Sequence, residues 1–477
     1  MHASKLVTTL LIVLWGAQLF LGQPHSATAA TSLVPVSGSL QAAINAARPG
    51  DTLVLEPKTY NEQIRIEGSG EAQRPITLKG AGVGASTIQG SVRIEGAFIV
   101  LEDLTVDVNG GDDDAVSLAA PAHDIALRRV RLHNGTGYGV RVGNDVAAVV
   151  IEQCVIDNFN AGSKDAHGIG IMTAREVTVS KCDIFNTSGD AIQVNTPDYP
   201  GYGRAASAIR IEDNSLHDTR ENALDIKSTD GLVAQNNLMW GFRAVDSSDG
   251  MAVQVQYAAR NITLSGNQIW SAVEGIEVSR GVKNGTAYPQ APSGVLIAGN
   301  LIRDLVADPN GDSGSGSGIV VRSSSDVRVY NNTVLAAPGK GLYVSTSRSG
   351  DYPAGVDIRN NVFEGHADDL ALAFAPEQAQ GLVIDYNHYV SGRVSGGSLD
   401  AWRAEGYETH ASSGSPQLDA TWRPVAGSPL IDNGTPLGLV YKDAAPDRGW
   451  GELGGASIRL VGQYRVLLPL LRGRSGE

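Results

Sequence analysis

The chain has 477 residues, of which 57 are glycine and only 6% are aromatic, a composition typical of a turn-rich β structure with a narrow core. Its formal net charge is -14 and its isoelectric point is about 5.1, so we do not expect nucleic acid as a partner, because that needs a basic stripe. A protein with this negative charge can bind an acidic polysaccharide only through local basic groups or a bridging divalent cation.

Residues 1–29 have the pattern of a secretory signal peptide. Lys5 supplies the positive start, Leu6 to Leu21 form the apolar stretch, and Ala27-Thr28-Ala29 offers small residues for cleavage. The alternative is a retained membrane anchor, which the polar residues 23–26 argue against. We therefore expect a monomer that is secreted, either extracellular or at the cell surface, with no membrane span after the signal is removed.

A short amphipathic helix is predicted at residues 39–48, directly before the first strands. Leu40, Ile44 and Ala47 are spaced like one face of a helix, Ser39 is a suitable N-cap, and Pro49-Gly50 ends the helix. Such a helix closes the open end of a β solenoid, whose first coil otherwise exposes apolar core and unpaired strand edges.

Along the rest of the chain, a short strand is repeatedly followed by a small polar residue at the same aligned position. The strands VVIEQ, VTVSK, IRIED, LVAQN, ITLSG, VLIAG, VRVYN, VDIRN and LVIDY precede Cys154, Cys182, Asn214, Asn237, Asn267, Asn300, Asn332, Asn361 and Asn387. One repeat earlier, IALRR precedes Val130. Successive positions from Asn214 on are between 23 and 33 residues apart, which is typical of a solenoid. Stacked asparagines can hydrogen-bond from coil to coil, so we expect a buried asparagine ladder.

Cys154 and Cys182 occupy this position in adjacent repeats. Neighbouring strands are about 4.8 Å apart, which falls in the disulfide range, but side chains stacked in register point in parallel directions. The two residues are either bridged or, as this geometry favours, two buried thiols in place of asparagine.

A second strand follows in each repeat, and its alternating pattern points one set of residues outward. Aligned on the preceding glycine or alanine, the outward residues form three columns. The first is Tyr138, His167, Asp190, Asn222, Asp249, Glu274, Ser317 and Lys340. The second is Arg141, Gly170, Gln193, Asp225, Ala252, Glu277, Val320 and Tyr343. The third is Gly143, Met172, Asn195, Lys227, Gln254, Ser279 and Arg322.

We predict a catalytic site where acidic and basic residues of these columns lie close together. Stacked carboxylates repel unless one is protonated or a cation lies between them, so we expect calcium ligands among Asp190, Asp249 and Glu274, with Asp225 beside them. Lys227 lies close to them, and a lysine near bound cations can have its pKa lowered enough to act as a base. That combination suits β-elimination of a uronate. The alternative for Asp225 and Lys227 is an ordinary exposed ion pair.

Further residues are expected to bind substrate along the same face. Arg141, His167 and Arg322 are candidate contacts for substrate carboxylates, and Gln193 and Gln254 offer amides. Tyrosines recur beside proline in loops that border this face, where they suit sugar stacking or simply pack the loops: Tyr199, Tyr202 and Tyr288.

These features resemble the right-handed parallel β-helix superfamily of pectate-lyase-like secreted proteins. The segment LQAAINAARPGDTLVLEPKTYNEQIRI is similar to the usual entry of such proteins, including chondroitinase- and alginate-lyase-like members, and residues 426–434 are similar to a piece often found past the last coil. The resemblance covers residues 32 to 390. It implies an all-β fold, a right-handed parallel β-helix of about eleven coils over residues 30–390, with the capping helix at its N-terminus and a loop-rich C-terminal cap or tail at 391–477.

The resemblance also implies chemistry, although less specifically. Lyases of this superfamily commonly use calcium with a lysine or arginine, and the run from Glu221 to Lys227 is similar to the strand that carries the base in some of them. Hydrolases, epimerases, adhesins and phage proteins share the fold. The leading hypothesis is a secreted polysaccharide lyase acting on an acidic polysaccharide. The alternatives are a glycoside hydrolase with paired carboxylates, and a non-catalytic surface protein that binds glycans or acts as a spacer.

Overall fold

The computed structural model describes residues 32–195, 205–245, 248–283, 286–308, 311, 315–346, 350–395, 397–454 and 459–460. The predicted signal peptide, Tyr199 and Tyr202 lie outside these residues.

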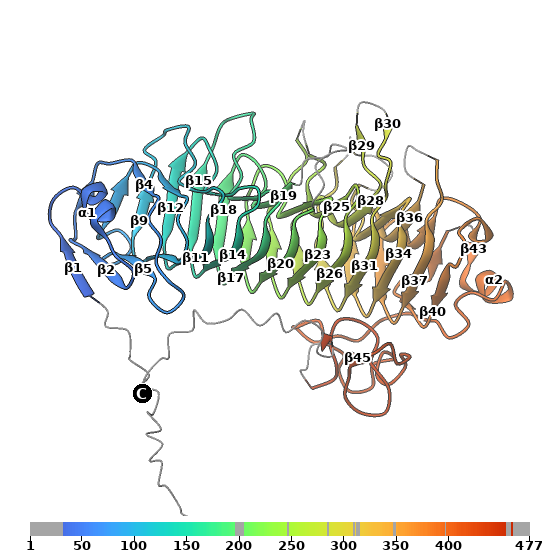
Figure 1. Ribbon diagram of the computed structural model, residues 1–477. Helices are drawn as coiled ribbons and strands as arrows, with labels where there is room; N and C mark the ends of the chain where they lie inside the picture. The colour runs from blue at the N-terminus through green and yellow to red at the C-terminus, as the bar shows by residue number, and fades with distance from the viewer. Residues whose placement is uncertain are drawn as a thin grey trace, which may run out of the picture.

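Three sheets of fourteen strands each wrap the described chain into one elongated solenoid (Figure 1). Sheet A consists of β1 (Ser32–Val36), β2 (Asp51–Leu55), β5 (Ile76–Lys79), β8 (Ile99–Glu102), β11 (His123–Arg128), β14 (Ala147–Glu152), β17 (Arg175–Ser180), β20 (Ser207–Glu212), β23 (Asp230–Gln235), β26 (Arg260–Ser265), β31 (Ser293–Ala298), β34 (Ser325–Tyr330), β37 (Ala354–Arg359) and β40 (Val383–Asp385).

Sheet B consists of shorter strands: β3 (Thr59–Tyr60), β6 (Thr87–Gln89), β9 (Thr105–Asp107), β12 (Arg131–Gly135), β15 (Val155–Phe159), β18 (Asp183–Thr187), β21 (Ser215–His217), β24 (Leu238–Trp240), β27 (Gln268–Trp270), β32 (Leu301–Arg303), β35 (Thr333–Ala337), β38 (Val362–Gly365), β41 (His388–Tyr389) and β44 (Ser412–Ser413).

Sheet C consists of β4 (Ile64–Ile66), β7 (Val92–Ile94), β10 (Val116–Leu118), β13 (Val140–Val142), β16 (Ile169–Ile171), β19 (Ile192–Asn195), β22 (Leu224–Lys227), β25 (Met251–Gln256), β28 (Glu274–Ser279), β33 (Ile319–Arg322), β36 (Lys340–Ser345), β39 (Asp368–Leu372), β42 (Arg393–Val394) and β43 (Gly397–Ser398). Each coil visits sheets A, B and C in turn, and neighbouring strands are parallel except for the β42–β43 pair.

The predicted right-handed parallel β-helix is confirmed, but the sequence analysis found only two of the three strands in each coil. It recognised the strands of sheets A and C and missed those of sheet B. A strand such as β21 has a single buried residue, Leu216, between two partly exposed ones, so it is too short for alternation to be recognised.

The recurring polar position lies inside the turn from sheet A to sheet B. The residue before it adopts the left-handed region, for example Lys181 with φ of 54° and Asn236 with φ of 56°, which turns the chain sharply. The side chain that follows is then buried: Asn237 and Asn267 are fully enclosed. Local backbone geometry therefore places this side chain in the core.

The asparagines are hydrogen-bonded to one another from coil to coil. Asn267 Nδ2 donates to Asn300 Oδ1 at 3.0 Å and to the carbonyl of Ala234 at 3.0 Å, while its Oδ1 accepts from the backbone N–H and Nδ2 of Asn237. The same pattern runs from Asn214 to Asn387. Every buried amide in this run is thus satisfied.

The two cysteines continue the row toward the N-terminus as free thiols. Cys154 Sγ lies 3.5 Å from the carbonyl oxygen of Leu127, and Cys182 Sγ lies 3.5 Å from that of Ile151. The amide of Cys182 donates to Asn214 Oδ1 at 2.9 Å, so the thiols join the asparagine ladder.

The N-terminal end of the solenoid is closed by α1 (Leu40–Ala46). Ser39 is its N-cap and accepts from the amide of Ala42, as predicted, and Leu40 and Ile44 are buried. The helix covers the first coil, where Gln41 bonds the backbone of Arg65.

The C-terminal part continues the sheets and then folds back along the outside. Beyond β41 lie β42 to β44 and α2 (Leu399–Ala404). A loop-rich segment, residues 415–454, follows and lies beneath the solenoid in Figure 1. Its strand β45 (Leu439–Val440) pairs with β46 (Arg459–Leu460). This segment is joined to the solenoid by hydrogen bonds from Asn331 Nδ2 to the carbonyl of Asp447 and from the amide of Trp450 to Thr333 Oγ1. A short 3-10 helix, Pro376–Gln378, precedes β40. Within the described residues, no helix has both the length and the apolar character needed to cross a membrane.

Candidate functional site

The outer face of sheet C carries most of the residues selected from the sequence. Along one column, register partners follow in the order Gln193, Asp225, Gln254 and Glu277. Along the next column they follow in the order Lys227, Gln256, Ser279 and Arg322. Because the strands are in register, each step is about 4.8 Å along the solenoid.

The sequence alignment of β25 is wrong by two residues. It placed Asp249 beside Glu274, whereas Met251 is the register partner of Glu274, and Gln254 is the partner of Asp225. The alignment used Gly250 as the residue before the strand. Gly250 instead lies in a turn with φ of 76°, and Ala252 occupies the place expected for the glycine. Asp249 is exposed on that turn and is not part of the column.

An ion pair between Lys227 and Asp225 lies at the centre of this face. Lys227 Nζ is 2.5 Å from Asp225 Oδ2; the lysine side chain is 20% exposed and the aspartate side chain 5%. Gln193 Nε2 donates to Asp190 Oδ2 at 3.0 Å and to Asp225 Oδ2 at 3.4 Å, so it links the two carboxyl groups. Asp225 Oδ1 is buried and has no hydrogen-bond partner among the described residues. In this group, the lysine reaches solvent and the acids lie beneath it.

Burial raises the pKa of both aspartates, and nearby carboxylates add to the shift of Asp190. Asp190 is fully buried, and burial together with the charges of Asp225 and Glu221 raises its pKa well above the usual range. Burial also raises the pKa of Asp225, although the ion pair with Lys227 opposes this shift. Asp190 Oδ1 accepts hydrogen bonds from the amide and Nδ2 of Asn222.

The pKa of Lys227 is shifted upward. Burial lowers it, but the charges of Asp225 and Asp190 outweigh burial, so the pKa lies above its usual value. The sequence analysis expected a lowered pKa, and this direction is wrong because the carboxylates act on the lysine directly. At neutral pH the side chain is an ammonium ion.

His167 lies beneath the face rather than on it. Its side chain is 2% exposed, its Nδ1 accepts a hydrogen bond from the amide of Asp190 at 2.8 Å, and its ring packs edge-on against Tyr138. Burial and three nearby cations lower the pKa of His167 to about 3. The neutral, enclosed ring presents no charge to a ligand, which corrects the expectation that His167 contacts a substrate carboxylate. It positions Asp190 instead.

The predicted calcium ligands do not converge on one point. Asp190 precedes β19 and Glu274 begins β28, three strands away in sheet C, which separates them by about 14 Å. Calcium needs its oxygen ligands at about 2.3–2.6 Å from one ion. Asp249, on the exposed turn, is outside the column. The predicted set therefore does not fit a shared calcium ion.

Another group does converge, and the sequence analysis missed one of its members. Potential ligand atoms of His167, Asp190 and Glu221 all lie within 4.8 Å of one another. The histidine offers nitrogen, which calcium does not favour, and its Nδ1 already accepts the Asp190 amide. Glu221 is 5% exposed and lies 3.2 Å from Arg220 Nη2. The sequence analysis named Glu221 only as the first residue of the run that ends at Lys227.

Two arginines lie on the same face, one on each side of Lys227. Arg141, on β13, is bonded to Asp114 with Nε 2.6 Å from Oδ2, and its guanidinium lies 4.0 Å from the centre of the Tyr138 ring. Arg322, on β33, lies with Nε 3.3 Å from Glu277 Oε2. These predicted substrate-binding residues thus lie on the same face of sheet C as Lys227, with side chains that are 41% exposed at Arg141 and 12% at Arg322.

Of the two glutamines predicted to bind substrate, one lies at the surface and the other is buried. Gln254 is partly exposed between Lys227 and Arg322, where a ligand can reach it. Gln193 is 6% exposed, and its nitrogen is engaged by Asp190 and Asp225. Gln193 therefore organises the carboxyl groups rather than facing solvent.

Loops beyond sheet C border this face. The hairpin of β29 (Val282–Lys283) and β30 (Thr286–Ala287) projects from the solenoid next to β28 (Figure 1). After it, Tyr288 packs against Tyr257 with ring centres 4.7 Å apart, and the carbonyl of Tyr288 accepts from Arg280 Nε at 2.6 Å. Tyr257 directly follows Gln256, the register partner of Lys227. The sequence analysis missed Tyr257 because it lies just past the alternating pattern.

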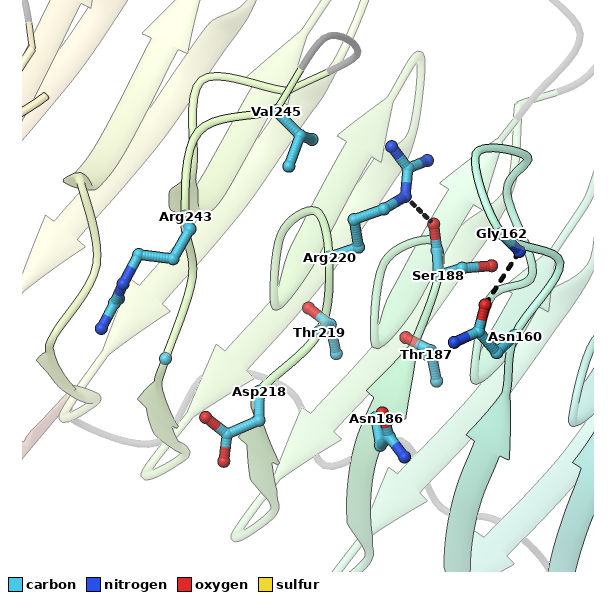
Figure 2. A pocket seen from close by; sticks show the side chains of 11 residues that line it. Asn160, Gly162, Asn186, Thr187, Ser188, Asp218, Thr219, Arg220, Arg243 and Val245 are labelled. Atoms are coloured by element: carbon cyan, nitrogen blue, oxygen red, sulfur yellow. Dashed lines mark hydrogen bonds between the residues drawn. The ribbon is translucent and has the colours of Figure 1, made fainter.

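A polar pocket of about 430 Å³ lies at the ends of the sheet B strands (Figure 2), and its lining includes Ser188 and Arg220, close in sequence to the buried Asp190 and Glu221. Arg220 extends along it, and its Nε donates to the carbonyl of Ser188 at 2.6 Å. Ser188 Oγ and Thr219 Oγ1 donate to backbone carbonyls. These side chains hold the turns together, so the pocket is part of the support of the site.

The sequence matches the family described as right-handed β-helix region over residues 92–288 and 245–407, which together make up more than half of the chain. The chain belongs to this family. No curated protein sequence matches it.

Solved structures show the same fold at low sequence identity. A mutant of the PL6 family alginate lyase AlyGC has a TM-score of 0.57 and 13% identity, with 93% of this chain and 60% of that chain covered. The alginate lyase from Paenibacillus sp. has a TM-score of 0.45 and 16% identity over 68% of this chain and 96% of that chain. Pectate lyase Pel9A has a TM-score of 0.40 and 14% identity, with 89% of this chain and 97% of that chain covered. The AlyGC comparison, with a TM-score above 0.5, shows that the chain shares the fold of that structure.

Proposed function

We propose that this protein is a secreted lyase that cleaves a uronate-containing polysaccharide by β-elimination on the outer face of sheet C. The observation that carries the proposal is the Lys227–Asp225 ion pair, in which a solvent-facing ammonium group is held over buried acids, with Arg141 and Arg322 on the same face. Cations that face solvent on a chain with a formal charge of -14 favour an anionic ligand. The similar fold of the PL6 family alginate lyase supports this substrate class.

In the proposed reaction Lys227 is the catalytic base and Asp225 positions it. The neutral amine takes the proton from C5 of a uronate, the C4–O4 bond breaks as the C4–C5 double bond forms, and the new ammonium group returns the proton to the departing O4. Asp225 holds Nζ at 2.5 Å, which fixes the direction of the amine. Since no single calcium site fits the predicted ligands, no step is assigned to a metal.

The raised pKa of Lys227 gives the reaction a pH signature. Only the deprotonated amine can accept the C5 proton, and the carboxyl groups of Asp225 and Asp190 keep the amine protonated at neutral pH. Activity is therefore expected to rise with pH from neutral into the alkaline range.

Burial argues against the hydrolase alternative. A glycoside hydrolase needs two carboxyl groups that touch the substrate. Of the acids that could form such a pair, the side chains of Asp190 and Asp225 are 0% and 5% exposed, below the surface that a sugar can reach. Asp249 is exposed, but it lies on a turn outside their column. The residue that reaches solvent is the lysine.

The test is a panel of polyuronates and neutral glycans, incubated with the wild type and Lys227→Ala. We expect an unsaturated, ultraviolet-absorbing product from at least one polyuronate with the wild type, and a loss of at least about 100-fold with the variant. Lys181→Ala, at an exposed lysine in the turn between sheets A and B, is the matched control and should keep full activity. A variant at Lys227 with wild-type activity would reject this base. New reducing ends without unsaturation would indicate a hydrolase, and no product at all a binding or structural role.

A further inference from the structure

A stripe of aromatic side chains runs along the outer face of sheet B, a different sheet from the one that carries Lys227. Four neighbouring strands, β18, β21, β24 and β27, contribute one register-matched ring each: Phe185, His217, Trp240 and Trp270. Successive rings are stacked face to face, with interplanar angles of 8°, 6° and 8° and centres 4.9, 4.1 and 4.8 Å apart. All four residues are partly exposed, so this aromatic stripe presents ring edges to solvent.

The edges of the two tryptophans carry hydrogen-bond donors that the described part of the chain does not use. The indole nitrogens of Trp240 and Trp270 are not buried, and neither makes a hydrogen bond with a described residue. Buried tryptophans normally satisfy this N–H group within the protein. The two indole N–H groups of the stripe are therefore donors that a ligand can reach.

The polar pocket of Figure 2 lies directly beside the aromatic stripe. Three residues that line it each follow a member of the stripe in the sequence: Asn186, Asp218 and Gly241. Other lining side chains are buried and donate to backbone carbonyls, so the pocket is preformed: Thr187, Ser188 and Thr219. Its volume of about 430 Å³ is in the range of small-molecule sites.

Asp218 provides a hydrogen-bond acceptor in this pocket. Its Oδ2 lies 2.8 Å from His217 Nδ1, and its side chain is 61% exposed. Gly241 leaves room for the carboxylate, because a Cβ there would lie 2.3 Å from Asp218 Oδ1. Among the described residues, none donates a hydrogen bond to Oδ1. The carboxylate is thus oriented by His217 and accessible to a hydroxyl group of a ligand.

The two arginines that line the pocket are already bound by other groups of the protein. Arg220 donates to the carbonyl of Ser188 and lies 2.8 Å from Asp165 Oδ1. Arg243 donates to the carbonyl of Ser271 and, at 3.1 Å, to its Oγ. Two amides and one carboxylate make up the other exposed polar side chains: Asn160, Asn186 and Asp218. Carboxylates of the protein would repel a uronate here, whereas an uncharged hydroxyl meets both donors and acceptors.

We propose that the aromatic stripe and this pocket form a binding site for a neutral saccharide. A sugar ring combines apolar C–H groups with hydroxyl groups that both donate and accept. The ring edges and indole N–H groups contact the sugar along the stripe, and Asp218 accepts from a hydroxyl group in the pocket. The site goes beyond the proposed lyase activity, because it lies on another sheet and takes an uncharged ligand.

The test is calorimetric titration at pH 7 with neutral gluco-, manno- and xylo-oligosaccharides. At least one of them should bind the wild type. Asp218→Ala removes the acceptor and Trp240→Ala removes a ring with its donor, so each should weaken binding by about tenfold or more. Trp240→Phe keeps a ring in the stack and loses only the N–H group, so its affinity should lie between those of the wild type and Trp240→Ala.

Two further variants are the controls. Tyr352→Ala removes an aromatic ring that is 45% exposed and packs against Phe374, away from the stripe, so it should bind the sugar as the wild type does. Lys227→Ala should also keep this affinity, since Lys227 lies on sheet C. Circular dichroism and the urea midpoint show that each variant is folded.

The outcomes are separate from those of the lyase assay. No binding of any neutral oligosaccharide at millimolar concentration, or wild-type affinity of both Asp218→Ala and Trp240→Ala, would overturn the site. Loss of binding in Lys227→Ala would place the sugar on sheet C instead. Self-association that Trp240→Ala abolishes, without sugar binding, would assign the stripe to a second copy of the chain. Binding of a neutral sugar with no unsaturated product would contradict the lyase and leave this site standing.

Discussion

At the scale of single residues, the reactivity of the site depends on how Asp225 and Asp190 act on Lys227. Both carboxyl groups are buried, and both favour the charged form of the lysine. An amine that must first lose a proton works best where that proton is weakly held. The same ion pair that positions Lys227 therefore limits its activity at neutral pH.

Replacing the partner of Lys227 should move the pH profile of the enzyme. In Asp225→Asn the attraction that stabilises the ammonium group is lost, so the pKa of Lys227 falls by about 1–3 units. More of the amine is then deprotonated at a given pH, and the alkaline rise of kcat/KM shifts to lower pH by the same amount. The pH dependence of kcat/KM for both forms measures this shift.

The matched control is Asp114→Asn, which makes the same change under Arg141, three strands away. Its profile should keep the wild-type midpoint, because Asp114 has no contact with Lys227. A profile that stays in place in Asp225→Asn, or that moves to higher pH, would show that Lys227 does not act as the base.

At the scale of the elements, the buried asparagines and the strands they connect set the register of the outer face. Asn267 makes hydrogen bonds to two neighbouring coils, whereas Cys154, in the same row, makes only weak contacts through sulfur at 3.4–3.5 Å. One row thus contains strongly and weakly bonded positions. The two can be compared directly.

Substitution within this row should have position-dependent costs. Asn267→Val leaves the amide groups of Asn237 and the oxygens of Ala234 and Asn300 buried without their partner, at about 1–3 kcal/mol for each unsatisfied group. Cys154→Val should cost less than about 1 kcal/mol, since Val130 fills the position one coil earlier. The urea midpoint of each variant tests this. Equal midpoints for the two variants would contradict a stabilising role of the amide hydrogen bonds.

At the C-terminal end of the row of asparagines, Glu408 makes the stability of the fold depend on pH. Glu408 accepts hydrogen bonds from Asn387 Nδ2 at 2.6 Å and from the Tyr389 hydroxyl at 2.5 Å, and burial raises its pKa to about 7. A carboxyl group whose folded pKa is raised binds its proton more tightly when folded, so its contribution to stability is largest at low pH. That contribution is lost as the pH rises from about 4.5 to about 7, by on the order of 3 kcal/mol.

Glu408→Gln should remove this dependence, because the amide resembles the neutral acid. We expect the variant and the wild type to have similar free energies of unfolding at pH 5, and the variant to be the more stable at pH 8. Urea unfolding at the two pH values measures both. A variant that is less stable than the wild type at pH 8 would show that the carboxylate itself is needed at the end of the row.

The sequence predicted the elements better than the details of the site, for physical reasons visible in particular residues. The row from Asn214 to Asn387 identified the solenoid because a strand and a turn both leave their pattern in the sequence. Register failed at Gly250, where a longer turn moved the glycine away from the strand and Ala252 took its place. The alternating pattern also cannot predict how buried an outward-pointing side chain is. It predicts that His167 points outward, although neighbouring turns and Tyr138 enclose the ring.

At the scale of the whole molecule, the active face and the folded-back C-terminal segment lie on different sides of the solenoid. Sheet C carries Lys227, whereas residues 415–454 contact strand ends of sheets A and B through Asn331, Thr333 and Asn360. Arg448 lies at the centre of this contact. It donates to Ser412 Oγ at 2.5 Å and to the carbonyls of His410 and Asn433.

Loosening this segment should therefore leave catalysis unchanged. Arg448→Gln removes four hydrogen bonds of a side chain that is almost fully buried, which should expose residues 415–454 to limited proteolysis several-fold faster. The kcat and KM for a polyuronate should stay within twofold of the wild type. A large fall in kcat with intact coils would place part of the active site on this segment.

The central claim is that the face around Lys227 breaks a uronate chain by elimination, and the mass of the products made in heavy-oxygen water tests it most directly. Elimination forms a double bond and adds no water, so products of the wild type should be unsaturated and lighter by one water than hydrolysis products, with any heavy oxygen confined to the exchangeable reducing-end hydroxyl. Lys227→Ala should yield almost none of them. Saturated products with one heavy oxygen per cleavage would contradict the account and identify a hydrolase.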